Sequence, residues 1–160
     1  MPPTIRAALR AACAWLLVSG LHAAEPVGHR LPKSAERRVD FATDIKPLLE
    51  QSCLPCHGPE KPKSGHRVDA RHAIIKGGDS DEAAIQPGKS ESSPLVHYIA
   101  GIVPDMEMPP LDSRDKYPAL SAEQIGLVRA WIEQGVAWPD TITLTPRKAA
   151  AADKSAAAGA

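Results

Sequence analysis

The sequence has few cysteines, no excess of either charge and no long apolar run after residue 21, and each of these absences excludes a class of protein. Only three cysteines occur among 160 residues, which excludes a disulfide-rich scaffold. Neither sign of charge is in excess, with 19 basic against 19 acidic residues, so nothing marks the chain as a nucleic-acid-binding protein. The length leaves room for one domain with extensions, and no second long apolar run follows the one at residues 11–21.

The first 24 residues predict a secretory signal peptide. Arg6 and Arg10 precede the apolar run 11–21, and small residues follow at Ala23 and Ala24. The run is about half as long as a membrane-spanning helix, although an uncleaved anchor is the alternative. Cleavage would remove Cys13 and leave 17 basic against 19 acidic residues. We therefore expect a periplasmic or otherwise exported protein with no stable membrane insertion.

The rest of the chain divides into three parts by composition. Residues 25–39 are polar, with proline and clustered arginine, and are interpreted as a linker. Residues 140–160 end in an alanine-rich stretch without apolar periodicity, which predicts a disordered tail. The folded domain is expected at 40–139. No segment has a convincing strand pattern, so the fold class is predicted to be all-α.

Three helices can be located by spacing and capping. The first is expected at 45–53, with Asp44 as its cap and Pro47 at its third position. A short second helix is expected at 94–100 after Ser93. The last is expected at 122–134, where Ser121 and Gln124 form a capping box at the start and Gly135 ends the helix. Its buried face is predicted to be the apolar stripe of Ile125, Val128, Trp131 and Ile132. So few helices make a weak core, which a large apolar cofactor would strengthen.

The segment Cys53-Leu54-Pro55-Cys56-His57 has the spacing of a c-type haem attachment site. Two thiols three positions apart on a helical turn face the same side, so each can add to one haem vinyl group. The following histidine is then the proximal ligand of the iron. We therefore predict one haem c, attached through Cys53 and Cys56, with His57 as an axial ligand.

Other chemistries use paired cysteines. A thioredoxin-like pair needs a βαβ setting, which the surrounding sequence does not predict. A zinc site needs further ligands at short spacing, and His66 and His72 do not provide the usual one. A plain structural disulfide is the third alternative.

The second axial ligand is predicted to be Met108. The segment 103–110 holds both remaining methionines, Met106 and Met108, among prolines that stiffen the loop. A thioether ligand favours reduced iron and raises the reduction potential. Met106, a histidine (His66, His72 or His97) and an open site stay as alternatives, and either methionine could simply fill space in the core.

The sequence offers candidates for two further roles around the haem without choosing between them. Lys63 and Arg67 follow the motif closely enough to reach a haem propionate, although solvated surface charge is the competing interpretation. A backbone carbonyl after the motif should fix the tautomer of His57, and Pro59 and Pro62 both offer one.

Several segments together resemble the planctomycete-type cytochrome c domain of the wider class I cytochromes c. The resemblance covers most of 41–139 and rests on FATDIKPLL from Phe41, CLPCHG from Cys53, KPKSG from Lys61, KGGD from Lys76, PGKS from Pro87, MEMPP from Met106 and LVRAWIEQG from Leu127. It implies a class I cytochrome c-like fold of three to four short helices with long loops, in which the first and last helices cross beside the haem. It also implies Met108 on the iron, while His66 departs from the family's usual apolar residue.

These features predict an electron-transfer protein, not an enzyme. Its partners would be redox proteins that bind transiently, and the chain itself is expected to be a monomer. One alternative is a five-coordinate or labile-ligand haem protein, such as a sensor or a peroxidase-like protein. The other is a haem-bearing subunit of a larger redox complex.

Overall fold

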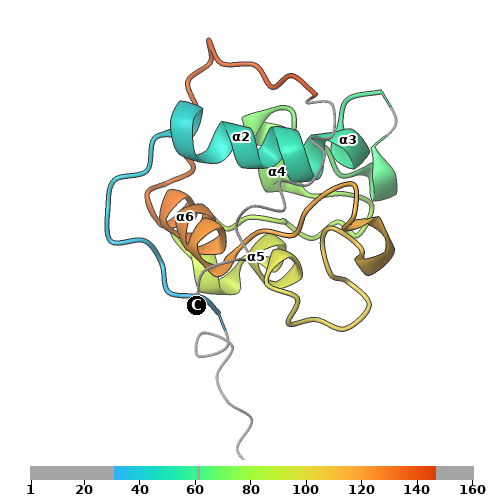
Figure 1. The fold of residues 1–160 in the computed structure, drawn as a ribbon. Coiled ribbons are helices and arrows are strands. Elements are labelled where there is room, and N and C mark those ends of the chain that lie inside the picture. Colours follow the sequence, from blue (N-terminus) through green and yellow to red (C-terminus); the bar gives the residue numbers. More distant parts are fainter. Residues whose placement is uncertain (1–30, 61, 147–160) are drawn as a thin grey trace, which may run out of the picture.

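The computed structural model describes residues 31–60 and 62–146, and in that part all regular secondary structure is helical (Figure 1). Apart from isolated 3-10 turns, four helical segments are present: a run over 41–57, then α4 (Arg71–Lys76), α5 (Pro94–Ile99) and α6 (Ala122–Glu133). Long loops connect them. The prediction of an all-α fold with few short helices and long loops is confirmed.

The first helical run begins four residues earlier than its apolar spacing predicted. Its cap is Asp40, whose carboxylate accepts from the Thr43 N–H at 2.9 Å. Asp44, the predicted cap, instead accepts from the Asp40 N–H and from both terminal nitrogens of Arg37. The two aspartate side chains together accept from the Thr43 and Asp40 N–H groups, and this reciprocal capping allows the helix to start at Phe41.

Two prolines determine the internal geometry of this run. It alternates between π turns and α turns, as η1 (Phe41–Ile45), α2 (Lys46–Leu48), η2 (Leu49–Cys53) and α3 (Leu54–His57). Each π turn is closed by the residue directly before a proline: Lys46 donates to Phe41, and Leu54 donates to Leu49. A proline ring crowds the carbonyl of residue i−4 and offers no N–H, so the helix widens locally and continues.

The two later predicted helices lie where expected. Helix α5 begins at Pro94, but the Ser93 hydroxyl bonds to Gln86 and Lys89 and does not cap it. Helix α6 has the full capping box of Ser121 and Gln124, and Gly135 follows its end with a φ of 89°. Its predicted apolar stripe is buried throughout. Helix α4 was not located from the sequence, because its six residues are too few to show a period.

The first run and α6 pack through aromatic side chains. Trp131 of α6 is 1% exposed, its ring centre lies 5.9 Å from that of Phe41, and its indole N–H donates to the Ala137 carbonyl at 2.7 Å. Trp138 stacks on Phe41 at 4.1 Å. The first and last helices therefore meet at the Phe41 end of the run, and the Cys53–His57 end is free to form a site.

Residues 31–39, the described part of the predicted linker, pack along α6 (Figure 1, blue). Leu31 and Val39 are buried, and Ala35 donates its N–H to the Gly126 carbonyl at 3.0 Å. The buried Arg129 side chain donates to the Pro32 carbonyl and to Ser90 and Glu91. A Cβ on Gly126 would lie 2.5 Å from the Lys33 carbonyl oxygen, so glycine permits this close approach.

Residues 140–146, where the sequence predicted the start of a tail, lie against the first helical run (Figure 1, orange-red). The Thr145 N–H donates at 2.7 Å to Glu50, a carboxylate that is 2% exposed and also pairs with Lys46. The predicted signal peptide at 1–24 and the rest of the tail lie outside the described residues. Within the described ranges, no helix is long and apolar enough to cross a membrane.

Candidate haem site

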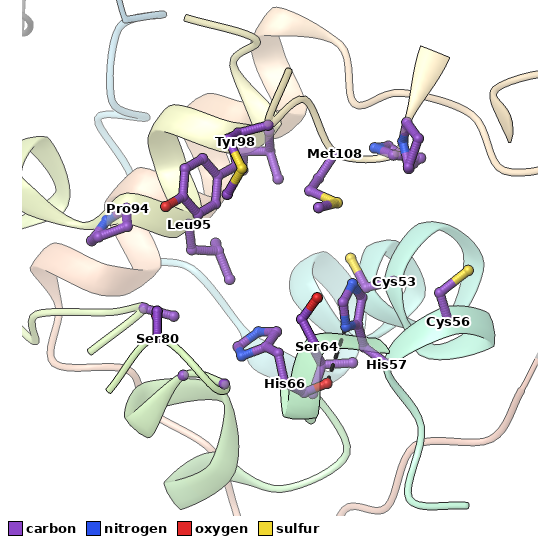
Figure 2. Close-up of a pocket in the computed structure, with 18 of the residues that line it drawn as sticks. Cys53, Cys56, His57, Ser64, His66, Ser80, Pro94, Leu95, Tyr98 and Met108 are labelled. Atoms are coloured by element: carbon purple, nitrogen blue, oxygen red, sulfur yellow. Dashed lines mark hydrogen bonds between the residues drawn. The ribbon is translucent and has the colours of Figure 1, made fainter. Parts of the chain in front are cut away.

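One cavity of about 330 Å³ lies beside the end of the first helical run (Figure 2). Its size is at the lower end of the range for ligand sites, and most of its wall is apolar. Four segments line it: α3 with the residues before it, the loops within 64–84, α5, and the loop that carries the methionines. The cavity holds all four predicted site residues: Cys53, Cys56, His57 and Met108.

Cys53 and Cys56 lie three positions apart on the helical turn at the cavity edge, and both are free thiols. Burial, and secondarily the neighbouring Cys56, raise the pKa of Cys53 to about 12. A thioredoxin-like pair depends on a lowered thiol pKa, so this environment disfavours that alternative. No group of three or more possible metal-binding side chains occurs in residues 31–60 and 62–146, and the zinc alternative therefore gains no support.

His57 is held by the backbone of the loop that follows it. Its Nδ1 lies 3.0 Å from the carbonyl oxygen of His66 (Figure 2, dashed line). The two prolines that the sequence offered for this role do not fill it, and the Pro62 carbonyl instead accepts from the Gly65 N–H. A carbonyl can only accept, so Nδ1 carries the proton and Nε2 has the free lone pair that a metal needs.

The His66 side chain also belongs to this wall of the cavity. Its ring makes an edge contact with that of His57, with 5.2 Å between centres. Burial lowers the pKa of His57, although the His66 and Lys63 carbonyls oppose the shift, and burial together with His57 lowers the pKa of His66. Both rings therefore favour the neutral form. His66 lies beside His57, not opposite to it, so it is poorly placed to be the second axial ligand.

Two glycine-containing loops fix the position of the His66 carbonyl. Asp79 donates its N–H to the Ser64 carbonyl at 2.9 Å, and a Cβ on Gly78 would lie 2.1 Å from that same oxygen. A Cβ on Gly65 would lie 2.0 Å from an Asp79 carboxylate oxygen. The loops at 64–66 and 77–79 can approach this closely only because the facing residues have no side chain. The KGGD motif of the sequence thus has a structural role next to His57.

Met108 lies on the opposite wall from His57 (Figure 2). It is partly buried against the core, and its N–H donates to the Tyr98 carbonyl of α5 at 3.0 Å. The bond to Pro109 is a cis peptide. Met106 also lines the cavity but is 41% exposed. Of the two methionines, Met108 is the less exposed one, and its backbone is anchored to α5.

The remaining predicted groups lie outside the cavity wall. His72 is exposed on α4, and Nε2 of His97 lies 2.7 Å from the Glu91 carbonyl oxygen. Arg67 forms two hydrogen bonds to Asp69, and neither Arg67 nor Lys63 is among the lining residues. The lining residues that the sequence did not single out come mostly from α5 and the 80–84 segment, among them Tyr98, Leu95 and Glu82.

These residues suit a covalently attached haem. Two thiols on one edge can form thioethers, a neutral imidazole has its Nε2 free, and a thioether lies across an apolar cavity. This is the donor set expected for a haem of the His/Met type.

Comparison with known proteins agrees with this fit. Residues 53–112 match a family described as Planctomycete cytochrome C. No curated protein and no solved structure matches the chain. The matched region begins at Cys53 and includes both loops around His66, α5 and Met108, so it contains the whole wall described above except Ser52 and Leu120. The resemblance inferred from the sequence motifs is confirmed for these residues: 53–112 are similar to the planctomycete-type cytochrome c domain, and this similarity supports haem binding.

Proposed function

We propose that this protein is an exported one-electron carrier with a single haem c. In this proposal Cys53 and Cys56 attach the haem, and His57 and Met108 bind its iron. The observation that carries the proposal is the placement of His57 and Met108 on opposite walls of one apolar cavity, with Nδ1 of His57 already occupied.

A haem bound in this cavity would supply a one-electron iron couple and no open site for a substrate. The chain's own contributions follow from its contacts. The His66 carbonyl keeps His57 in one tautomer and increases the basicity of its Nε2. The Tyr98 carbonyl anchors the backbone at Met108, so the thioether has a fixed starting point. The apolar wall keeps water away, which favours the less charged, reduced iron.

Haem attachment and ligation can be tested on the full chain, made in a host that matures c-type cytochromes. A haem stain that survives a denaturing gel would support covalent attachment. The ferric protein should have the faint far-red band of sulfur-ligated haem, and Met108→Ala should remove it. Met106→Ala is the matched control and should keep the band. Loss of the band in Met106→Ala alone would move the ligand to Met106.

The alternative of a labile or five-coordinate haem protein predicts a different result. Carbon monoxide should then bind the untreated ferrous wild type as readily as it binds Met108→Ala. The carrier proposal predicts slow or negligible binding to the wild type and fast binding to the variant. Equal, fast binding in both would overturn the His/Met proposal and favour the alternative.

Export is the remaining part of the proposal and rests on the sequence of residues 1–24. Expression of the full chain in a bacterial host should yield a shortened mature protein in the periplasmic fraction. N-terminal sequencing should then find a start close to residue 25. A full-length chain in the membrane fraction would support the uncleaved anchor instead.

A further inference from the structure

The charge around the cavity is one-sided, although the chain as a whole is balanced. Among the described residues that line the cavity, Asp79 and Glu82 are the carboxylates, and none is lysine or arginine. Both carboxylates are exposed. The exposed Asp81 lies between them in the chain, and the exposed Asp105 and Asp112 flank the lining residues of the methionine loop. We call these five residues the acidic rim.

Most arginines of the described chain are engaged elsewhere. Arg37 and Arg67 pair with aspartates, Arg129 is buried, and Arg71 donates to the carbonyls of residues 135 and 136. Arg114 lies nearest to the methionine loop, where its Nε donates to the Pro109 carbonyl, but the segment 103–116 still has four acidic against two basic residues. Lys63 is close enough to affect His57 but does not line the cavity. Among residues 31–60 and 62–146, no ion pair joins a member of the acidic rim to a lysine or arginine.

Apolar side chains are exposed next to the acidic rim. Leu111 is 65% exposed and Met106 is 41% exposed, and they are the exposed large hydrophobic residues of the described chain. Both lie on the loop that carries Met108, and the exposed Pro110 between them lines the cavity. An apolar centre with a charged periphery is the usual anatomy of a protein interface.

We infer that this face is the docking surface for a basic one-electron redox protein, which contacts Met106 and Leu111 and is oriented by Asp79 and Glu82. The inference rests on the proposed function, since it names the partner of that same site. With haem bound as proposed, one electron would pass between the two redox centres in each encounter, with no change of covalent bonds and no proton transfer. Opposite charges steer such encounters and are screened by salt.

Small oxidants of opposite charge test the rim without a protein partner. In separate experiments the ferrous mature protein is oxidised by the tripositive tris(phenanthroline)cobalt(III) and by the trinegative tris(oxalato)cobalt(III). Added salt should slow the first reaction and speed the second. The double variant Asp79→Asn, Glu82→Gln should be oxidised about threefold more slowly by the cationic complex at low ionic strength. Its oxidation by the anionic complex should be faster than that of the wild type. Glu82→Gln alone should give a smaller change of the same sign.

The matched control removes two charges from residues that do not line the cavity. Glu36→Gln with Asp140→Asn has the same change in net charge, and Asp140 follows Trp138, which stacks on Phe41 at the other end of the first helical run. Phe41 and Cys53 are twelve residues apart, or roughly 18 Å along a helix. This variant should therefore keep rates close to the wild type. Equal effects of the two double variants would overturn the inference, because net charge alone would then explain the rates.

A protein probe tests the partner itself. A lysine-rich cytochrome c should exchange electrons with the wild type several-fold faster than the same protein with acetylated lysines, since acetylation removes the charge but not the redox centre. Leu111→Ser should slow this exchange and leave the small anionic oxidant unaffected. Failure of this inference can be distinguished from failure of the proposed function. If the protein has no covalent haem that can be reversibly reduced, both the proposed function and this inference are wrong. With such a haem but no preference for the basic probe, only the inference falls.

Discussion

Nδ1 of His57 lies 3.0 Å from the carbonyl oxygen of His66, a residue nine positions further along the chain. The loop that presents this oxygen is held by a second loop, through the bond from the Asp79 N–H to the Ser64 carbonyl. The orientation of His57, the proposed iron ligand, therefore depends on individual contacts between two loops that no common helix or sheet holds together.

Gly78→Ala should disturb this arrangement, because the new Cβ would lie 2.1 Å from the Ser64 carbonyl oxygen. A weaker hydrogen bond at Nδ1 makes His57 a less basic ligand, and this favours reduced iron. We expect the covalent haem to be retained and the reduction potential to rise. Gly88→Asn is the control, since no atom lies within 4 Å of that position and asparagine tolerates its positive φ. An unchanged potential in Gly78→Ala would contradict the role assigned to the loops.

Removal of the thiols should separate attachment from binding. With Cys53→Ala or Cys56→Ala alone, one thioether remains, and a denaturing gel should still stain for haem. The double variant should lose the stain, and its holoprotein should release haem to an acceptor protein. Covalent haem in the double variant would contradict the assignment of these cysteines.

Trp131→Phe should destabilise the fold by about 2–4 kcal/mol, because it leaves a gap in the core and removes the donor to the Ala137 carbonyl. Denaturant unfolding of the holoprotein measures this. Trp138→Phe is the comparison: the side chain is only half-buried, although its N–H also bonds to a carbonyl. We expect the smaller loss there. A larger loss of unfolding free energy for Trp138→Phe would show that Trp138, and not Trp131, makes the principal contact with the first helical run.

Gly126→Ala should have the opposite effect from the one that helix propensity predicts. Alanine in place of a helical glycine normally stabilises by about 1 kcal/mol. Here the added Cβ would lie 2.5 Å from the Lys33 carbonyl oxygen, so residues 31–39 must move away from α6. We expect a lower Tm and faster tryptic cleavage at the exposed Arg37 and Arg38. A higher Tm with unchanged cleavage would show that the contact is unimportant.

Asp44→Asn should reveal how much the pH-dependent ion pair between Arg37 and Asp44 stabilises the packing of residues 31–39 on the first helical run. Hydrogen bonds from Arg37 hold the pKa of Asp44 below its ordinary value. A carboxyl whose pKa is lower in the folded state stabilises the fold above its ordinary pKa, and this stabilisation is lost as the pH falls through the lowered value. Because the pair lies near the surface, we expect a small decrease in Tm at pH 7.

The comparison with pH 3 or below is the control for that variant. The difference in Tm between wild type and Asp44→Asn should become smaller there, because the carboxyl of the wild type is then increasingly protonated. A difference that is the same at both pH values would mean that the Arg37 pair does not cause it.

Much of the fold could be predicted from local sequence signals. The capping box at Ser121 and Gln124, the stripe that includes Trp131, and Pro94 at a helix start each depend on neighbours within about one turn, so they can be read from the chain directly. The first helix was predicted to start too late, because Asp40 and Asp44 are both suitable caps and only their hydrogen bonds distinguish them.

The sequence by itself determined the chemistry: the two thiols with the adjacent histidine, a methionine loop stiffened by prolines, and the family that these motifs indicate. Only the tertiary structure decided which carbonyl orients His57, that residues 31–39 pack on α6, and that Asp79 and Glu82 border the cavity. The physical reason is separation along the chain. Each of these contacts joins residues nine or more positions apart, and their proximity depends on how the loops and helices pack together.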